Sequence, residues 1–172
     1  MDVQGKKAAL IVALAGFRDE EYLEPRQVLV KAGIGVTTVS TGPGTARGKL
    51  GAKAAVDRLI EDLHVSDYEA ILFIGGPGAA DYFNHPRALA VANDAVAAGK
   101  VLGAICIAPG TLARAGVLKG KRATCFPSEE PSLKKAGAVY TGQDVEVDGR
   151  IVTANGPHAA RAFGQAVVRL LT

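Results

Sequence analysis

The sequence predicts an α/β domain in which helices cover both faces of a mainly parallel sheet, and three observations support this class. Short apolar runs rich in Val, Ile and Leu recur along the chain, which suits strands buried on both faces. Segments of helix-forming composition separate these runs, and Gly33 and Gly99 follow two of the segments, where helices commonly end. We expect one three-layer α/β/α domain over residues 1–172. The apolar runs are residues 8–14, 36–39, 70–74 and 101–106.

The first strand and helix are predicted from residues 8–14 and 20–32. The strand is a continuous apolar run with Ile and Val. In the helix, Leu23, Val28 and Leu29 are available for an inward stripe.

The next region has a weaker pattern. Residues 36–39 are rich in β-branched residues and predict a strand. Residues 41–51 are rich in glycine and predict a loop. Residues 53–68 are ambiguous, and we expect a short strand followed by a helical piece near residues 59–63.

Strands and helices alternate clearly in the middle of the chain. The strand at residues 70–74 is broken by the Gly-Gly-Pro-Gly sequence of residues 75–78. Residues 86–98 begin with proline and predict a helix. The strand at residues 101–106 then leads into a helix near residues 111–115.

The C-terminal part predicts a hairpin and a last helix. Asp148-Gly149 between two short apolar segments is a strong hairpin signal. The elements expected there are strand-like residues 122–125, helical residues 131–136, hairpin strands at 145–147 and 151–153, and a helix that Pro157 opens and Leu171 ends.

Composition and charge exclude several classes of function. The net charge is +3, and Lys and Arg are spread among acidic residues, so nucleic-acid binding is not indicated. The chain has two cysteines, which do not make a disulfide framework, and no secretory signal. The apolar run at residues 8–14 is too short to span a membrane. We expect a cytoplasmic protein that needs no metal or cofactor.

Cys106 occupies the most informative position. It ends an apolar strand, with the small residues Ala104 and Ala108 two positions before and after it, which is the spacing that a nucleophile elbow requires. The helix that follows directs unpaired N–H groups toward the sulfur, so we expect a stabilised thiolate. The alternative is that Cys106 is a small buried apolar residue at the end of a core strand.

Two further strand ends are expected beside Cys106, because ligands bind beyond the carboxyl ends of parallel strands. After the third apolar run, the backbone of Gly75 and Gly76 can approach a ligand closely. The N–H groups of Gly76 and Ile107 would then form an oxyanion hole. The end of the first strand supplies the acidic residues Asp19, Glu20, Glu21 and Glu24.

Four segments, residues 16–25, 73–78, 103–116 and 147–156, resemble the signature regions of the DJ-1/ThiJ/PfpI superfamily, which is related to class I glutamine amidotransferases. The resemblance covers nearly the whole chain. It implies a flavodoxin-like domain, a homodimer and Cys106 as the reactive residue.

The resemblance also implies the acidic partner of the cysteine. The glutamate of the family lies four residues before a proline in the first helix, and Pro25 places it at Glu21. In the family this group is a protonated glutamate that donates to the thiolate, so that the two titrate as a coupled pair. Glu20 and Glu24 are the substitutes if the helix is rotated.

The sequence departs from the family at three positions. Ile107 stands where the peptidase-like branch has a histidine, and Phe126 stands where the deglycase-like branch has one. Asn155 replaces an expected arginine. A peptidase with a Cys–His pair is therefore disfavoured. His158 is the histidine nearest a strand end and is a candidate for the pocket wall or a solvated residue, and Cys125 is a candidate resolving thiol or a core residue.

We expect a cofactor-free enzyme in which Cys106 attacks a small reactive carbonyl compound and Glu21 shuttles the proton, as in glyoxalase or deglycase action. The competing expectation is a redox-sensing or chaperone-like stress protein that uses oxidation of Cys106. Further alternatives are a hydratase of isonitriles or cyclic imides and an intracellular peptidase whose base comes from a neighbouring subunit.

Overall fold

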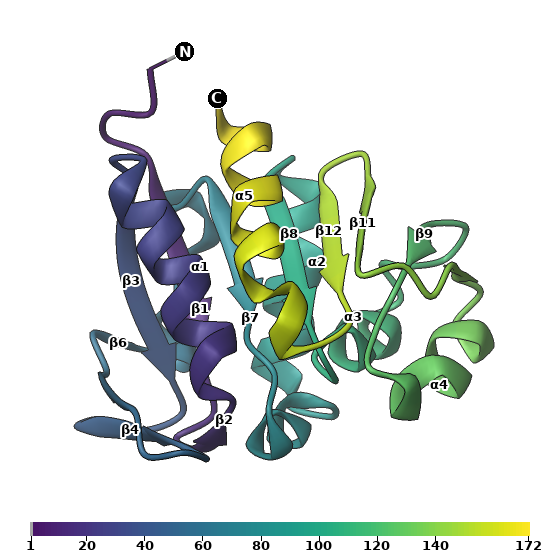
Figure 1. Ribbon diagram of the computed structural model, residues 1–172, viewed down its shortest axis with the longest axis horizontal. Helices are drawn as coiled ribbons and strands as arrows, with labels where there is room; N and C mark the ends of the chain where they lie inside the picture. Colours follow the sequence, from purple (N-terminus) through teal and green to yellow (C-terminus); the bar gives the residue numbers. More distant parts are fainter. Residues whose placement is uncertain (1) are drawn as a thin grey trace.

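A seven-stranded sheet forms the middle layer of the computed structural model, which describes residues 2–172 (Figure 1). Its strands are β1 (Lys7–Ile11), β3 (Gly35–Ser40), β6 (Arg58–Leu59), β7 (Ala70–Phe73), β8 (Val101–Ile105), β11 (Val145–Asp148) and β12 (Ile151–Ala154). The order across the sheet is β11-β12-β8-β7-β1-β3-β6, and β11 is the strand that runs antiparallel to its neighbour. The mainly parallel sheet is confirmed, and so is the hairpin predicted at Asp148-Gly149.

Helices cover both faces of this sheet, as predicted. They are α1 (Asp19–Lys31), α2 (Pro86–Ala97), α3 (Pro109–Ala115), α4 (Glu130–Lys135) and α5 (Ala160–Leu171). In Figure 1, α1 and α5 lie in front of the sheet, and α2 and α3 lie behind it. None of the helices in residues 2–172 combines the length and the apolar character needed to cross a membrane.

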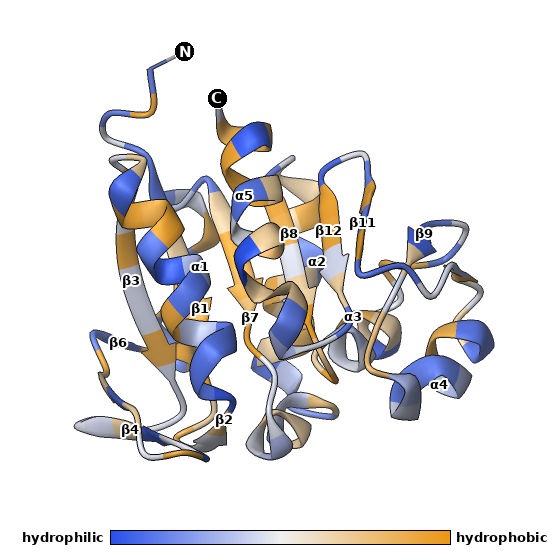
Figure 2. Cartoon of the chain, in the orientation of Figure 1, coloured by the Kyte–Doolittle hydropathy of each residue, from blue (hydrophilic) through white to orange (hydrophobic). Residues whose placement is uncertain are grey.

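The alternation of side chains along β1 explains why the sheet needs two helical layers. Ala8 and Leu10 pack in the same core as Phe163 of α5, whereas Ala9 and Ile11 pack in the opposite core with α2. Both sets are fully buried, which is why the strand is apolar throughout. Figure 2 shows the same pattern, with apolar strands at the centre and polar residues on the outer faces of the helices.

Some short strands were not predicted, whereas the short strand expected within residues 53–68 and the strand-like segment at residues 122–125 are confirmed. The segments β2 (Ala15–Phe17), β4 (Thr45–Gly48) and β5 (Lys53–Ala55) form a small sheet in the order β2-β4-β5. The prediction of a loop over residues 41–51 is therefore wrong at β4. Strands this short carry little local signal, and β2 pairs with β4 far along the chain, although β4 and β5 form a local antiparallel pair. A second pair joins β9 (Arg122–Ala123) to β10 (Val139–Tyr140), and 3₁₀ helices span Ile60–Asp62, Val65–Asp67, Pro77–Tyr82, Pro127–Glu129 and Pro157–Ala159.

The predicted inward stripe of α1 is only partly right. Leu29 is buried, but Leu23 is 47% exposed, and Tyr22 and Pro25 are buried instead. The reason is that α1 packs along α5 as well as against the sheet. At the crossing, a Cβ on Gly164 would lie 2.9 Å from the Cα of Pro25, so the two helix backbones are in close contact.

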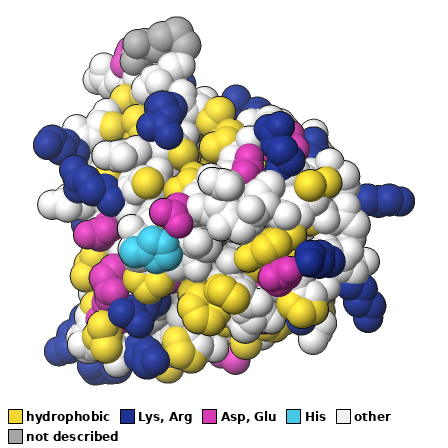
Figure 3. Space-filling model, turned by 45° about the vertical axis from the view of Figure 1, so that its right-hand side comes forward, with side chains coloured by type: hydrophobic (Ala, Val, Ile, Leu, Met, Phe, Trp, Pro, Cys, Tyr) yellow, Lys and Arg dark blue, Asp and Glu magenta, His cyan; other side chains and the backbone are white. Residues whose placement is uncertain are grey.

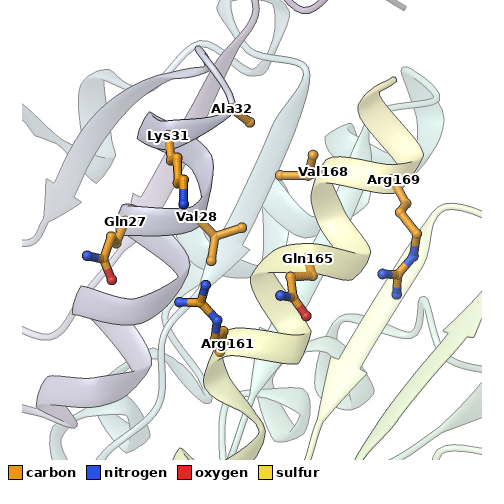
Figure 4. Close-up of a pocket in the computed structure, with 8 residues that line it drawn as sticks. All are labelled: Gln27, Val28, Lys31, Ala32, Arg161, Gln165, Val168 and Arg169. Atoms are coloured by element: carbon orange, nitrogen blue, oxygen red, sulfur yellow. The ribbon is translucent and has the colours of Figure 1, made fainter.

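A groove of about 590 Å³ lies between α1 and α5 (Figure 4). Its lining contains no cysteine and no carboxylate, so the predicted chemistry does not lie there. Basic side chains are scattered over the face shown in Figure 3, among apolar and acidic ones. The residues that line the groove are Gln27, Val28, Lys31, Ala32, Arg161, Gln165, Val168 and Arg169.

Candidate active site

Cys106 lies at a sharp turn directly after β8. Its φ is 66°, and it is the sole non-glycine residue with positive φ among residues 2–172. The turn is fixed on both sides, because the Cys106 N–H donates to the carbonyl of Ala154 (2.9 Å) and its carbonyl accepts from the N–H of Phe126 (2.8 Å). The backbone geometry of a nucleophile elbow is confirmed, and such a conformation costs about 1–2 kcal/mol for a residue with a Cβ.

Gly75 brings the end of β7 against the elbow. A Cβ at this position would lie 2.4 Å from Glu21 Oε1 and 2.6 Å from Cys106 Cβ, so no side chain fits. The Gly75 carbonyl also accepts the N–H of Arg18 at 2.9 Å, which fixes the start of α1. Three segments that are distant in the sequence therefore meet at this glycine.

Glu21 is the acidic residue that faces Cys106. It lies in the first turn of α1, is fully buried, and neither of its carboxyl oxygens has a well-formed hydrogen bond within residues 2–172. Burial raises the pKa of Glu21 to about 7, although contact with the Cys106 thiol and the charge of Arg18 act in the opposite direction. A substantial fraction of Glu21 is therefore protonated near neutral pH.

The sulfur of Cys106 is subject to opposing effects. Burial raises the pKa of Cys106 to about 12, and the negative charge of an ionised Glu21 acts in the same direction. Hydrogen bonds from the N–H groups of Gly76 and Ile107 lower it. The expected stabilised thiolate is therefore wrong for Cys106 beside an ionised Glu21, because burial outweighs the two N–H donors. Ile107 lies just before α3, which begins at Pro109 rather than at residue 111, whereas Gly76 follows β7.

A cavity of about 200 Å³ opens above the Cys106 sulfur. Its walls combine apolar side chains with two basic ones, and Glu21 is its acidic residue. The volume suits a small molecule of a few carbon atoms. The lining residues are Arg18, Glu21, Lys49, Gly76, Pro77, Cys106, Ile107, Phe126 and Pro157.

The structure brings some of the predicted pocket residues together and leaves others outside. Phe126 lines the cavity, and Gly75 lies beneath it against Glu21. Asn155 and His158 are not among the lining residues. Their side chains instead approach Asp144, at 3.4 Å and 3.3 Å, near the surface. The turn at Pro157 directs His158 toward solvent, and the prediction of a pocket role for these two residues is not supported.

Glu20 and Glu24 do not replace Glu21. Glu20 forms an ion pair with Arg18 at 2.8 Å near the surface. Glu24 is partly exposed and does not line the cavity. The orientation of α1 therefore selects Glu21, the residue four positions before Pro25.

The remaining histidines and the second cysteine lie away from the cavity. His85 is 3.6 Å from Glu61, and His64 lies in a separate surface pocket. Cys125 is a fully buried free thiol, whereas Cys106 is a free thiol that keeps 8% of its surface exposed. A single chain thus offers no histidine base for Cys106 within its cavity.

Arg18 and Lys49 were missed by sequence reasoning. Arg18 precedes α1, and Lys49 lies in the turn between β4 and β5. The carboxylate of Asp19 accepts the N–H groups of Leu50 (2.9 Å) and Ala52 (2.7 Å), which ties this turn to α1. No local sequence pattern predicts this contact between the turn and α1, although a glycine on either side of residues 49–50 indicates a tight turn.

Comparison with known proteins agrees with this geometry. The model of the DJ-1/PfpI family matches residues 6–170. The chain belongs to the DJ-1/PfpI family. This confirms the family resemblance inferred from the four signature segments.

Other family members are similar over almost the whole chain. Uncharacterized protein MJ0967 of Methanocaldococcus jannaschii is 40% identical over 99% of this chain and 84% of its own length. Protein/nucleic acid deglycase 2 of Escherichia coli is 32% identical over 96% of this chain and 98% of its own length. The crystal structure of a ThiJ/PfpI domain protein from Brachyspira murdochii has a TM-score of 0.95 and 30% identity, covering 98% of this chain and 97% of that one.

Proposed function

We propose that this DJ-1/PfpI protein is a cysteine-dependent enzyme that converts small reactive carbonyl compounds without a cofactor. The observation that carries the proposal is the contact between Cys106 and the buried carboxyl of Glu21 at the floor of a small cavity. The deglycase name of the relative from Escherichia coli points to the same chemical class.

Cys106 can act as a nucleophile if the shared proton resides on Glu21 and the negative charge on sulfur. An ionised Glu21 would be fully buried with no well-formed hydrogen bond, whereas a thiolate at Cys106 receives two backbone N–H groups. Once Glu21 is protonated, its charge no longer opposes the thiolate and its O–H can donate to the sulfur. The two groups then titrate as one unit and share a single proton above about pH 7.

The reaction follows from these roles. The thiolate bonds to the aldehyde carbon of a 2-oxoaldehyde while Glu21 protonates the oxygen, giving a hemithioacetal. The N–H groups of Gly76 and Ile107 stabilise the developing negative charge. The hydrogen of the former aldehyde carbon then leaves as a proton, and the neighbouring carbon gains one, giving a 2-hydroxy thioester. Water cleaves the C–S bond, so that a 2-hydroxy acid leaves and the thiol is restored.

The test is turnover of methylglyoxal by the purified protein. We expect lactate from the wild type, no lactate from Cys106→Ala, and a loss of about 100-fold or more in Glu21→Gln, in line with the contribution of a general acid or base. Glu24→Gln is the matched control on the same helix and should retain activity. Failure of the wild type to convert methylglyoxal, glyoxal and other small carbonyl compounds would contradict the proposal.

The competing function is redox sensing through the same two residues. Stepwise oxidation of Cys106 by peroxide would give a sulfinate, and a protonated Glu21 would donate a short hydrogen bond to it. Intact-mass measurement separates the two functions. A clean gain of two oxygens at Cys106 in a protein that is inert toward carbonyl compounds would favour the sensor.

We also propose that the chain forms a homodimer through the outer face of α1. Leu23 and Val30 are 47% and 51% exposed and, seven residues apart, lie on one side of the helix. Light scattering after size exclusion tests this proposal. The wild type should have twice the chain mass, and Leu23→Glu should shift it toward the monomer. A wild-type monomer would contradict it.

A further inference from the structure

Lys49 places an uncompensated positive charge in the wall of the Cys106 cavity. It lines the cavity together with Arg18, and Glu21 is the acidic residue in the same lining. Arg18 is already paired with Glu20 at 2.8 Å. None of the ion pairs and side-chain hydrogen bonds within residues 2–172 engages the ammonium of Lys49. The basic group that remains free to meet a ligand is therefore Lys49.

The backbone that carries Lys49 is held in place relative to the nucleophile. The Lys49 N–H donates to the carbonyl of Phe17 at 2.8 Å. The next residue, Leu50, donates to the buried carboxylate of Asp19 at 2.9 Å, two positions before Glu21 on α1. A Cβ on Gly48 would lie 2.4 Å from Asp19 Oδ1, so the turn approaches α1 more closely than any side chain would allow. This packing fixes the base of the Lys49 side chain at the cavity.

The rest of the cavity wall is apolar. Pro77, Phe126 and Pro157 supply no charge and exclude water from part of the site. Lys49 itself is exposed to solvent, which screens its charge, so its attraction for an anion at this wall is expected to have the strength of a surface ion pair. The cavity therefore distinguishes ligands by charge as well as by size.

We propose that the preferred substrate is a small 2-oxoaldehyde that carries a carboxylate or another anionic group, and that Lys49 is the residue that selects it. This inference rests on the proposed carbonyl chemistry at Cys106 and adds the charge of the substrate. The ammonium of Lys49 meets the anionic end, and the aldehyde end reaches the sulfur.

The chemistry of such a substrate balances without another reactant except water. In 4,5-dioxopentanoate, Cys106 adds to the aldehyde carbon, the C–H hydrogen of that carbon leaves as a proton, and the adjacent ketone carbon gains a proton. Hydrolysis of the thioester then gives 2-hydroxypentanedioate and the free thiol. The aldehyde carbon is oxidised while its neighbour is reduced, so no external oxidant is involved.

The first experiment measures charge selection without any turnover. Cys106 is alkylated with iodoacetate, which is anionic, and with iodoacetamide, which is neutral and of nearly the same size. We expect the ratio of the iodoacetate rate to the iodoacetamide rate to exceed that of free cysteine. Lys49→Met should lower this ratio about fivefold, as for an exposed ion pair. Lys49→Arg should restore the ratio. Lys53→Met is the matched control, since it removes the same charge from an exposed residue of β5 outside the cavity lining.

The second experiment compares 4,5-dioxopentanoate with its uncharged methyl ester. We expect wild-type kcat/KM to be higher for the acid by about fivefold or more, and Lys49→Met to remove most of this preference by raising KM for the acid. Turnover of the ester should change less than twofold in Lys49→Met.

The outcomes separate this inference from the proposed function. Equal effects of Lys49→Met and Lys53→Met on the alkylation ratio would overturn the role of Lys49, even if methylglyoxal is converted. A protein that converts methylglyoxal but neither the acid nor the ester would overturn the substrate class alone. A protein that converts none of the three would overturn the carbonyl chemistry as well, even with a Lys49-dependent alkylation ratio. Preference for the ester would overturn the charge selection directly.

Discussion

The carboxyl of Glu21 and the side chain of Cys106 are both packed against the backbone of Gly75, so closely that a Cβ on this glycine would lie 2.4 Å from Glu21 Oε1 and 2.6 Å from Cys106 Cβ. Glu21 lies in the first turn of α1, and Cys106 directly follows β8. Their contact turns two buried, separately unfavourable charges into a pair that can share one proton. The account of the site depends on this contact.

Gly75→Ala should disable the site and destabilise the fold. The new methyl group has to displace the carboxyl, the elbow or the carbonyl oxygen of Ile105, which would lie 2.5 Å from it. Overpacking of this kind costs about 1–3 kcal/mol. Urea unfolding and the Cys106 alkylation rate measure the two effects. In Gly35→Ala the nearest atom is the flexible Lys7 side chain at 3.3 Å, and a change below about 0.5 kcal/mol is expected there.

Glu21 should make stability fall as the pH rises from 4.5 to about 7. Its pKa is raised from 4.5 to about 7 in the folded state, so the folded protein keeps a proton that the unfolded chain has lost. The stabilisation is complete below pH 4.5 and is lost as the pH rises through 7, by roughly 3 kcal/mol in total. The measurement is the free energy of unfolding at both ends of this range.

The control for this prediction compares two glutamate-to-glutamine variants on α1. Glu21→Gln should flatten the dependence of stability on pH, whereas Glu24→Gln, at a partly exposed position, should keep the wild-type slope. An unchanged slope in Glu21→Gln would show that another group is responsible.

Glycine should be tolerated better than alanine at position 106. The φ of 66° at Cys106 is strained for any residue with a Cβ. We expect Cys106→Gly to be more stable than Cys106→Ala by about 1 kcal/mol, while both lack activity. Thermal unfolding of the two variants tests this, and equal stability would argue against strain at the elbow.

Gly164→Ala should weaken the packing of α5 on α1. Its Cβ would lie 2.9 Å from the Cα of Pro25, and backbone cannot move aside as a side-chain tip can. We expect a loss of about 1–3 kcal/mol in spite of the better helix propensity of alanine. Denaturant unfolding measures it, and a stabilised variant would show that the two helices separate easily.

Much of the fold was predictable because its signals are local. The apolar run of β1 and the small residues around Cys106 report burial and a tight turn directly. The sheet β2-β4-β5 was not predicted as a whole, because β2 pairs with β4 far along the chain. For the same reason the sequence did not reveal Lys49, which the contact between Asp19 and Leu50 brings to the cavity.

The errors at the site concern the direction in which two side chains point and the effect of burial on a pKa. Asn155 and His158 follow a strand end, as site residues often do, but their side chains turn toward Asp144. The pKa of Cys106 beside an ionised Glu21 could not be predicted, because burial, which raises it, depends on the packing of the whole site. The pairing with Glu21 was predictable from the family pattern and the position of Pro25.

The pH dependence of Cys106 alkylation by iodoacetamide tests the shared proton most directly. If the proton resides on Glu21 and the charge on sulfur, the rate should rise with an inflection near pH 7 in the wild type, and the inflection should move to higher pH in Glu21→Gln. An inflection at or above the ordinary thiol value of 9.0 in both proteins would contradict the account.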